Sequence, residues 1–166
     1  YQVAGTVGLM MAKILKVNDQ QSLRCAVDLG IAMQLTNIAR DVVEDKRKNR
    51  VYIKADFNSI SETIFLADIF YQSSFPAIKN IPLFSRFAIL IARRIYKRIG
   101  HEVLSQKDIE TYNNAGKIYV SVLCKIVETF LSFFDLIKLF FINSSKQEKQ
   151  NEHIMLHEEI NLDERI

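Results

Sequence analysis

Residues 29–50 read "LGIAMQLTNIARDVVEDKRKNR", and this stretch decides the fold. Residues 29–39 carry no charge, which is typical of a helix that is buried over most of its circumference. At 100° per residue, Gln34, Asn37, Asp41 and Asp45 fall within an arc of about 80° on one side of that helix. The stretch therefore predicts a buried helix that turns two amides and two acids into one space.

The two acids of this arc predict a metal site. Asp41 and Asp45 lie one turn apart, with Glu44 beside them, and like charges at this spacing repel one another even in water. Mg²⁺ prefers oxygen ligands and commonly joins one or two carboxylates to a substrate phosphate. The alternative is a solvated helix end whose acids pair with the basic residues 46–48.

A glycine pair marks the preceding helix, which we expect over residues 1–16. Tyr1, Gly5, Gly8 and Ala12 share one face, although each glycine lowers helix stability by about 1 kcal/mol relative to alanine. Two interpretations remain open. The glycines either allow a second helix to pack closely, or leave a groove along which a ligand lies.

The rest of the chain predicts an all-α fold in one domain. Glycine and proline are few, at 5 and 2, and hydrophobic residues make up 49%. No strand alternation of any length occurs. The third helix is expected to begin with a capping box of Ser59 and Glu62. We expect helices over residues 1–16, 20–49, 59–74, 82–105 and 117–142, a loop over 49–57, and a polar, flexible tail over 143–166.

Composition excludes several classes of protein. A net charge of +3 without a cationic block argues against nucleic-acid binding. Cys25 and Cys124 lack the spacing of a zinc site or a disulfide framework, which favours a reducing cytoplasm. The most apolar region, 118–142, is interrupted by charges and does not predict a membrane span. Its segment 130–142 is either a core helix or a helix that docks on a membrane surface, so the protein is expected in the cytoplasm or at the membrane periphery.

Two motifs carry a family resemblance. "VAGTVGLMMAKIL", residues 3–15, and "DLGIAMQLTNIARDVVEDKRKNRVYI", residues 28–53, together resemble the second half of the phytoene synthase and squalene synthase family, the head-to-head prenyl synthases. The resemblance continues more weakly to about Lys125 and implies an isoprenoid-synthase-type helical bundle over 1–142. It also implies an N-terminal half with a second DxxxD motif, which we expect as the partner of this C-terminal half. Lys54 and Lys117 depart from the family, which has proline and arginine there.

The resemblance also assigns residues to a site. Asp41, Asp45, Asn37 and Glu44 are implied to bind Mg²⁺, or Mn²⁺ in its place, and Tyr1, Asp41 and Asp45 to act in catalysis. Arg40 is expected to point away from the acids, because it lies on another side of the helix. The residues implied to bind a prenyl diphosphate are Gln34, Asn37, Arg50, Tyr96, Lys117, Gly5 and Gly8.

The reaction that the resemblance implies is the head-to-head condensation of two geranylgeranyl diphosphates. It passes through a cyclopropyl diphosphate to phytoene, the first carotenoid, and uses no NADPH. Two alternatives stay open: a squalene or presqualene diphosphate synthase acting on farnesyl diphosphate, and an inactive helical half-domain.

Overall fold

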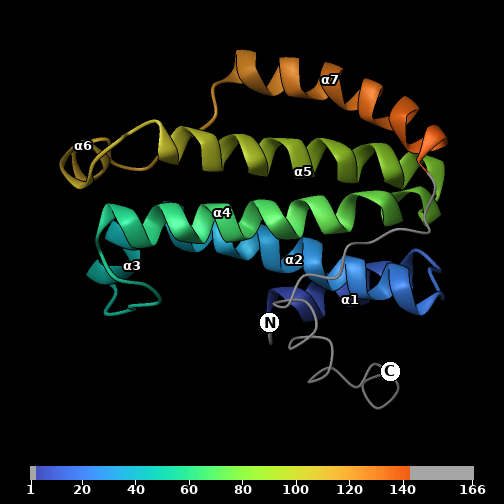
Figure 1. Cartoon of the computed structure of the whole chain (residues 1–166), viewed down its shortest axis with the longest axis horizontal. Helices are drawn as coiled ribbons and strands as arrows, with labels where there is room; N and C mark the ends of the chain where they lie inside the picture. The colour runs from blue at the N-terminus through green and yellow to red at the C-terminus, as the bar shows by residue number, and fades with distance from the viewer. Residues whose placement is uncertain (1–2, 143–166) are drawn as a thin grey trace.

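The computed structural model describes residues 3–142, and this part of the chain is all-α, as predicted (Figure 1). Tyr1 and the predicted tail over 143–166 lie outside the described residues. Across the described part, seven α-helices and one 3₁₀ helix follow one another without a strand. Their bounds are α1 Ala4–Ile14, α2 Gln20–Arg40, α3 Val42–Arg47, α4 Phe57–Ser74, η1 Phe75–Asn80, α5 Leu83–Leu104, α6 Ile109–Asn114 and α7 Val122–Phe141.

The long helices pack side by side in layers (Figure 1). Helix α2 contacts α1, α4 and α5, and α7 lies on the far side of α5 from α4. The main core lies around α2 and α4, where Leu23, Val27 and Phe70 are buried. A second buried cluster, around Ala39 and Ile60, closes the end at which α3 and α6 lie. The uncharged run of α2 is therefore central to the fold, as its sequence predicts.

The glycines of α1 and α2 allow these two helices to touch. A Cβ atom on Gly8 would overlap the carbonyl oxygen of Ala26, and one on Gly30 would overlap the carbonyl oxygen of Ala4. Gly5 is buried at the same contact, near Gly30. Close helix packing is thus one reason for Gly8, and its backbone neighbour leaves no room for a side chain.

The predicted helix over 20–49 is interrupted at one residue. Helix α2 ends at Arg40 and α3 begins at Val42, with Asp41 at φ −104° and ψ 14° between them. No glycine or proline marks this bend in the sequence. Its cause is therefore to be sought in tertiary contacts.

The start of α4 differs from the sequence prediction. Asp56 caps the helix, since its carboxylate accepts a hydrogen bond from the Ser59 N–H at 2.8 Å. Glu62 accepts a hydrogen bond from the Asn58 side chain instead of closing a capping box. The predicted box of Ser59 and Glu62 is wrong because an aspartate three residues earlier takes the cap position.

The start of the last helix is also later than predicted. Helix α7 begins at Val122 instead of Lys117, because Ser121 caps it by accepting the Cys124 N–H at 3.2 Å. The segment 115–120 before it has no regular structure. Two short elements, η1 and α6, were not predicted, whereas the end of α4 at Ser74 and both ends of α5 agree with the prediction within one residue.

Helix α7 turns its polar strip inward. Glu128 and Asp135 each form an ion pair with Arg94 of α5, at 3.3 and 3.4 Å, and Ser132 is fully buried. The opposite side, which we call the outer face of α7, is apolar and exposed, whereas Leu139 is buried in a cluster with Leu90 of α5, so segment 130–142 belongs to the core on one side only. Across residues 3–142 we find no helix with the length and hydrophobicity of a membrane span. The outer face includes Leu123, Ile126, Phe130, Phe133, Phe134 and Ile137.

Candidate functional site

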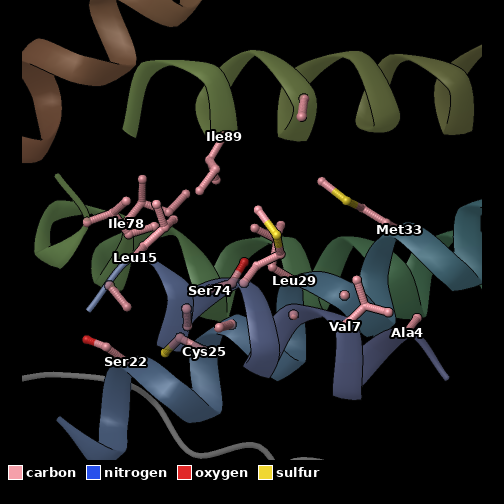
Figure 2. Close-up of a pocket in the computed structure, with 18 of the residues that line it drawn as sticks. Ala4, Val7, Leu15, Ser22, Cys25, Leu29, Met33, Ser74, Ile78 and Ile89 are labelled. Carbon is pink, nitrogen blue, oxygen red and sulfur yellow. The ribbon is translucent and has the colours of Figure 1, made fainter. Parts of the chain in front are cut away.

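A cavity of about 380 Å³ lies between α1, α2, η1 and α5 (Figure 2). Its wall is almost entirely apolar, with Val7 and Leu29 facing it from α1 and α2 and Ile89 from α5. Gly8 also lines the cavity, so the groove interpretation of the glycines applies to it together with close packing. Gly5, in contrast, is buried at the contact between the two helices.

Two of the predicted site residues give this cavity a polar portion. Gln34 and Asn37 of α2 belong to its wall, and they lie one or two turns before the acids. Both side chains are partly exposed, so their amides are accessible to a molecule in the cavity. The cavity therefore combines a long apolar wall with amide groups next to the acidic end of α2.

Asp41 is held by its neighbour in the chain. The Arg40 guanidinium donates from Nε to Oδ1 at 2.7 Å and from Nη2 to Oδ2 at 2.6 Å, a two-pronged pair. The hydrogen bond to Asp41 raises the pKa of Arg40 against the opposing effect of burial. The expectation that Arg40 points away from the acids is wrong, because its long side chain folds back to the carboxylate at the bend.

Glu44 forms ion pairs with two lysines. Its carboxylate accepts hydrogen bonds from Lys48 at 2.6 Å and from Lys117 at 3.0 Å. These bonds, that of Lys48 first, lower the pKa of Glu44 to about 2. Lys117 lies 73 residues from Glu44 in the chain. The fold therefore brings together two residues, Lys117 and Glu44, that the family resemblance had assigned to one site.

Asp45 lies at a different cavity. A smaller space of about 170 Å³ is lined by Asp45, Arg50 and Tyr52, together with Ile38 and Val42. The Arg50 N–H donates to the Asp45 carbonyl at 2.9 Å, which ties the following loop to α3. The four polar residues of the predicted arc do not share one cavity, because α2 and α3 are not one continuous helix and the 100° count fails at the bend.

Tyr96 of α5 is the remaining described residue of the predicted set. It packs, half-buried, against the core cluster around α2 and α4. Its electrostatic influence reaches Arg40, whose pKa it helps to raise. Tyr96 thus lies on α5, which contacts α2, and it is close enough to the acidic end of α2 to influence Arg40. Tyr1 lies outside the described residues.

The oxygen atoms near the bend are of the chemical type that a hard cation binds. Carboxylate and amide oxygens of Asp41, Asp45, Glu44 and Asn37 are the ligands that Mg²⁺ takes. In the described part of the chain, however, no three His, Cys, Asp or Glu residues are gathered around a common metal position. Arg40 already neutralises Asp41, so a cation that binds this carboxylate must compete with the guanidinium.

Sequence reasoning missed several residues of this region. The wall contributed by η1, such as Ile78, had no signal because η1 itself was not predicted. Tyr112 of α6 was also missed, although its hydroxyl contacts the backbone at the bend. Its six-residue helix is too short to show a periodic pattern.

Comparisons with known proteins agree with the motifs. Residues 1–59 match the family model described as squalene/phytoene synthase. The chain is 38% identical over 125 residues to a 15-cis-phytoene synthase of Enterobacter agglomerans, a match that covers 63% of this chain and 42% of that protein. It is 37% identical over 124 residues to a 15-cis-phytoene synthase of Pantoea ananas, covering 62% of this chain and 40% of the relative.

A plant protein is similar over a longer stretch. The chloroplastic phytoene synthase of an Oncidium hybrid cultivar is 32% identical over 155 residues, which covers 76% of this chain and 37% of that protein. The chain thus spans about two fifths of the length of the curated relatives it matches. These matches show that the chain is similar to members of the squalene/phytoene synthase family.

Proposed function

We propose that this chain forms one wall of the active site of a Mg²⁺-dependent prenyltransferase of the phytoene synthase type. The reaction condenses two geranylgeranyl diphosphates head to head, through a cyclopropyl diphosphate, to phytoene. The observation that carries the proposal is the apolar cavity whose amide-bearing portion adjoins the acidic end of α2. Relatives named phytoene synthase support the choice of substrate.

The apolar wall is the part that would hold the isoprenoid chain. Its volume of about 380 Å³ falls within the range of small-molecule sites, about 300–1,000 Å³. Side chains such as Val7, Leu29 and Ile89 offer neither a nucleophile nor a charged group to a carbocation. They would exclude water while the allylic cation is attacked by the second substrate.

The polar end is the part that would hold the diphosphate. Asp41 and Asp45, with Asn37 and Glu44, are the residues that would bind Mg²⁺, which when bound supplies positive charge to the departing diphosphate oxygens. Arg40 and Lys117 would add cationic hydrogen-bond donors beside them, since both already reach these acids. Lys117 offers a single ammonium where an arginine would offer a fork, so its phosphate contact is a point charge.

A second acidic helix completes the centre in this proposal. Two diphosphates leave in succession in the proposed reaction. The described residues offer one pair of aspartates for them, Asp41 and Asp45, at the junction of α2 and α3. The relatives are more than twice as long as their matches to this chain. We therefore assign the remaining diphosphate ligands to a partner segment outside these 166 residues.

A squalene-type reaction is the second candidate. The matching family model is described as covering both squalene and phytoene synthases. Such an enzyme would take farnesyl diphosphate, which is shorter by one isoprene unit. A comparison of binding between the two chain lengths separates the candidates.

Calorimetry on the full 166-residue chain tests the proposal. Geranylgeranyl thiolodiphosphate, an inert analogue, is expected to bind in the presence of Mg²⁺ and more tightly than its farnesyl counterpart. Asp41→Asn should weaken this binding by at least about tenfold, because it removes a charged oxygen donor. Binding that is the same in Asp41→Asn and in the unchanged chain would reject the site.

Asp19→Asn is the matched control. Asp19 caps α2 at the end opposite Asp41 by accepting the Ser22 N–H at 2.8 Å. Asparagine retains this cap while it removes the same charge. It should therefore leave analogue binding unchanged.

A further inference from the structure

The bend between α2 and α3 is confined to one residue. At Asp41 the backbone has φ −104° and ψ 14°, whereas a regular α-helix has about −63° and −42°. The hydrogen bonds on either side persist, from the Asp41 N–H to Asn37 at 2.9 Å and from the Asp45 N–H to Asp41 at 2.8 Å. The chain therefore changes direction at the carboxylate itself and continues as a helix.

The hydroxyl of Tyr112 lies at this bend. Its oxygen is 2.9 Å from the carbonyl oxygen of Ala39 and 2.8 Å from that of Arg40, the two carbonyls that precede Asp41. Carbonyls at the end of a helix need partners from outside it, and the Tyr112 O–H lies within hydrogen-bonding distance of both. Burial raises the pKa of Tyr112 to about 12, so the hydroxyl keeps its proton at neutral pH.

The ring of Tyr112 is fixed by the second core cluster. Only 2% of the residue is exposed, and it is buried with Ile60 of α4 and Val103 of α5. Helix α6 itself is capped by Asp108, which accepts the Thr111 N–H at 2.7 Å. The same cluster includes Ala39 of α2 and Val42 of α3, so the ring joins the bend to α4 and α5 and its hydroxyl can restrain where the bend lies.

The same segment of chain reaches the acids a second time. Five residues after Tyr112, Lys117 forms its ion pair with Glu44 on α3. The stretch from α6 to Lys117 therefore contacts the backbone before Asp41 and a side chain after it. Both contacts restrain the relative orientation of α2 and α3.

We propose that Tyr112 is a positioning residue, which fixes the bend through the Ala39 and Arg40 carbonyls and so sets the direction of the Asp41 carboxylate. The catalytic meaning of this role rests on the proposed function, in which Asp41 binds Mg²⁺ and diphosphate. The restraint on the bend does not depend on it.

Two measurements on Tyr112→Phe, which removes the hydroxyl and keeps the ring, test the proposal. Hydrogen exchange of the amides of residues 41–45 should become roughly tenfold faster, because the bend loses its fixed partner. Mg²⁺-dependent binding of geranylgeranyl thiolodiphosphate should weaken by about tenfold, the usual cost of losing a group that orients a ligand.

Tyr71→Phe is the control for the loss of a buried hydroxyl. Tyr71 is 1% exposed, and its hydroxyl is paired with Thr36 Oγ1 at 3.1 Å instead of with the carbonyls at the bend. This variant should lower the melting temperature at least as much as Tyr112→Phe while both readouts stay as in the unchanged chain. Equal effects of the two variants on exchange at 41–45 would overturn the proposal.

A rescue variant keeps the test decisive even if Tyr112→Phe folds poorly. Incorporation of para-aminophenylalanine at position 112 retains an N–H donor at nearly the same place and should restore both exchange and binding. Failure to restore either would overturn the positioning role. If the unchanged chain binds no analogue, the proposed function fails and the exchange measurement alone decides the role of Tyr112.

Discussion

Lys117 and Lys48 hold the Glu44 carboxylate from two directions, one from a distant segment and one from the next turn of the helix. Such ion pairs of single side chains neutralise negative charge at the junction of α2 and α3 in the absence of a ligand. Asp41 pairs with Arg40 and Glu44 with the two lysines. The balance can be perturbed one side chain at a time.

Replacement of Lys117 by glutamine should raise the pKa of Glu44 from about 2 while leaving it below 4.5, because Lys48 remains. Since the folded-state pKa is lowered, the stabilisation is present above pH 4.5 and is lost as the pH falls towards 2. A carbon-13 titration of the Glu44 carboxyl measures the shift. Lys13→Gln, at the end of α1, is the control and should leave the titration unchanged.

Gly8→Ala should destabilise the fold by about 1–3 kcal/mol, the usual cost of forcing an extra carbon into a packed contact. Its Cβ would meet the rigid backbone at Ala26. Gly100→Ala is the matched control, because its Cβ would lie 3.2 Å from a side-chain carbon of Ile64 that can move. Urea unfolding should give a clearly smaller loss for Gly100→Ala, and equal losses would contradict the packing argument.

At the scale of the element, the cap of α4 is sensitive to pH. The Ser59 N–H, the largest cause, lowers the pKa of Asp56, so the charged cap stabilises the helix above pH 3.8 and less as the pH falls below it. Asp56→Ala should lower the melting temperature at pH 7, and by less as the pH falls further below 3.8. Asp56→Asn keeps an acceptor for Ser59 and should lower the melting temperature less than alanine does.

The helices that could be predicted from sequence are those with long periodic patterns. The uncharged run of residues 29–39 predicted helix α2, and the apolar side that follows Pro82 predicted α5. The bend at Asp41 could not be predicted, because its partner Tyr112 lies 71 positions later, in a helix too short to recognise. The start of α7 was misplaced because Lys117 is drawn to Glu44 and the cap at Ser121 was not recognised.

Prediction of the site succeeded in part for similar reasons. The spacing of Gln34 and Asn37 placed both on one side of α2, and they do line the same cavity. The same count failed for Asp45 because it assumes a helix without a bend. Arg40 was misassigned because a direction calculated for Cβ says little about the end of a long, flexible side chain.

At the scale of the whole molecule, the chain leaves large apolar surfaces uncovered. The outer face of α7 carries Phe130 and Phe134, and α1 adds Val7 and Met11. Contiguous apolar surface of this kind is unusual on an isolated soluble domain. It should bind the dye ANS in the folded state.

Replacement of Phe130 and Phe134 together by glutamate should reduce this dye fluorescence roughly twofold, because it divides the outer face of α7. The melting temperature should change little, since both rings are more than half exposed, at 65% and 53%. Phe65→Glu, on α4 and 59% exposed, is the control for an isolated surface ring. An unchanged signal in the double variant would show that the dye binds elsewhere.

The attachment of α7 to α5 has a consequence for how the chain responds to its medium. On its inner side, α7 is joined to α5 by the ion pairs of Arg94 with Glu128 and Asp135. On its outer face, apolar side chains are exposed to solvent. Because the paired side chains are at most 23% exposed, ionic strength screens their attraction only weakly. Mild detergent covers the apolar side chains that face out, so purification in detergent should keep the last helix in place over a wide range of salt concentrations.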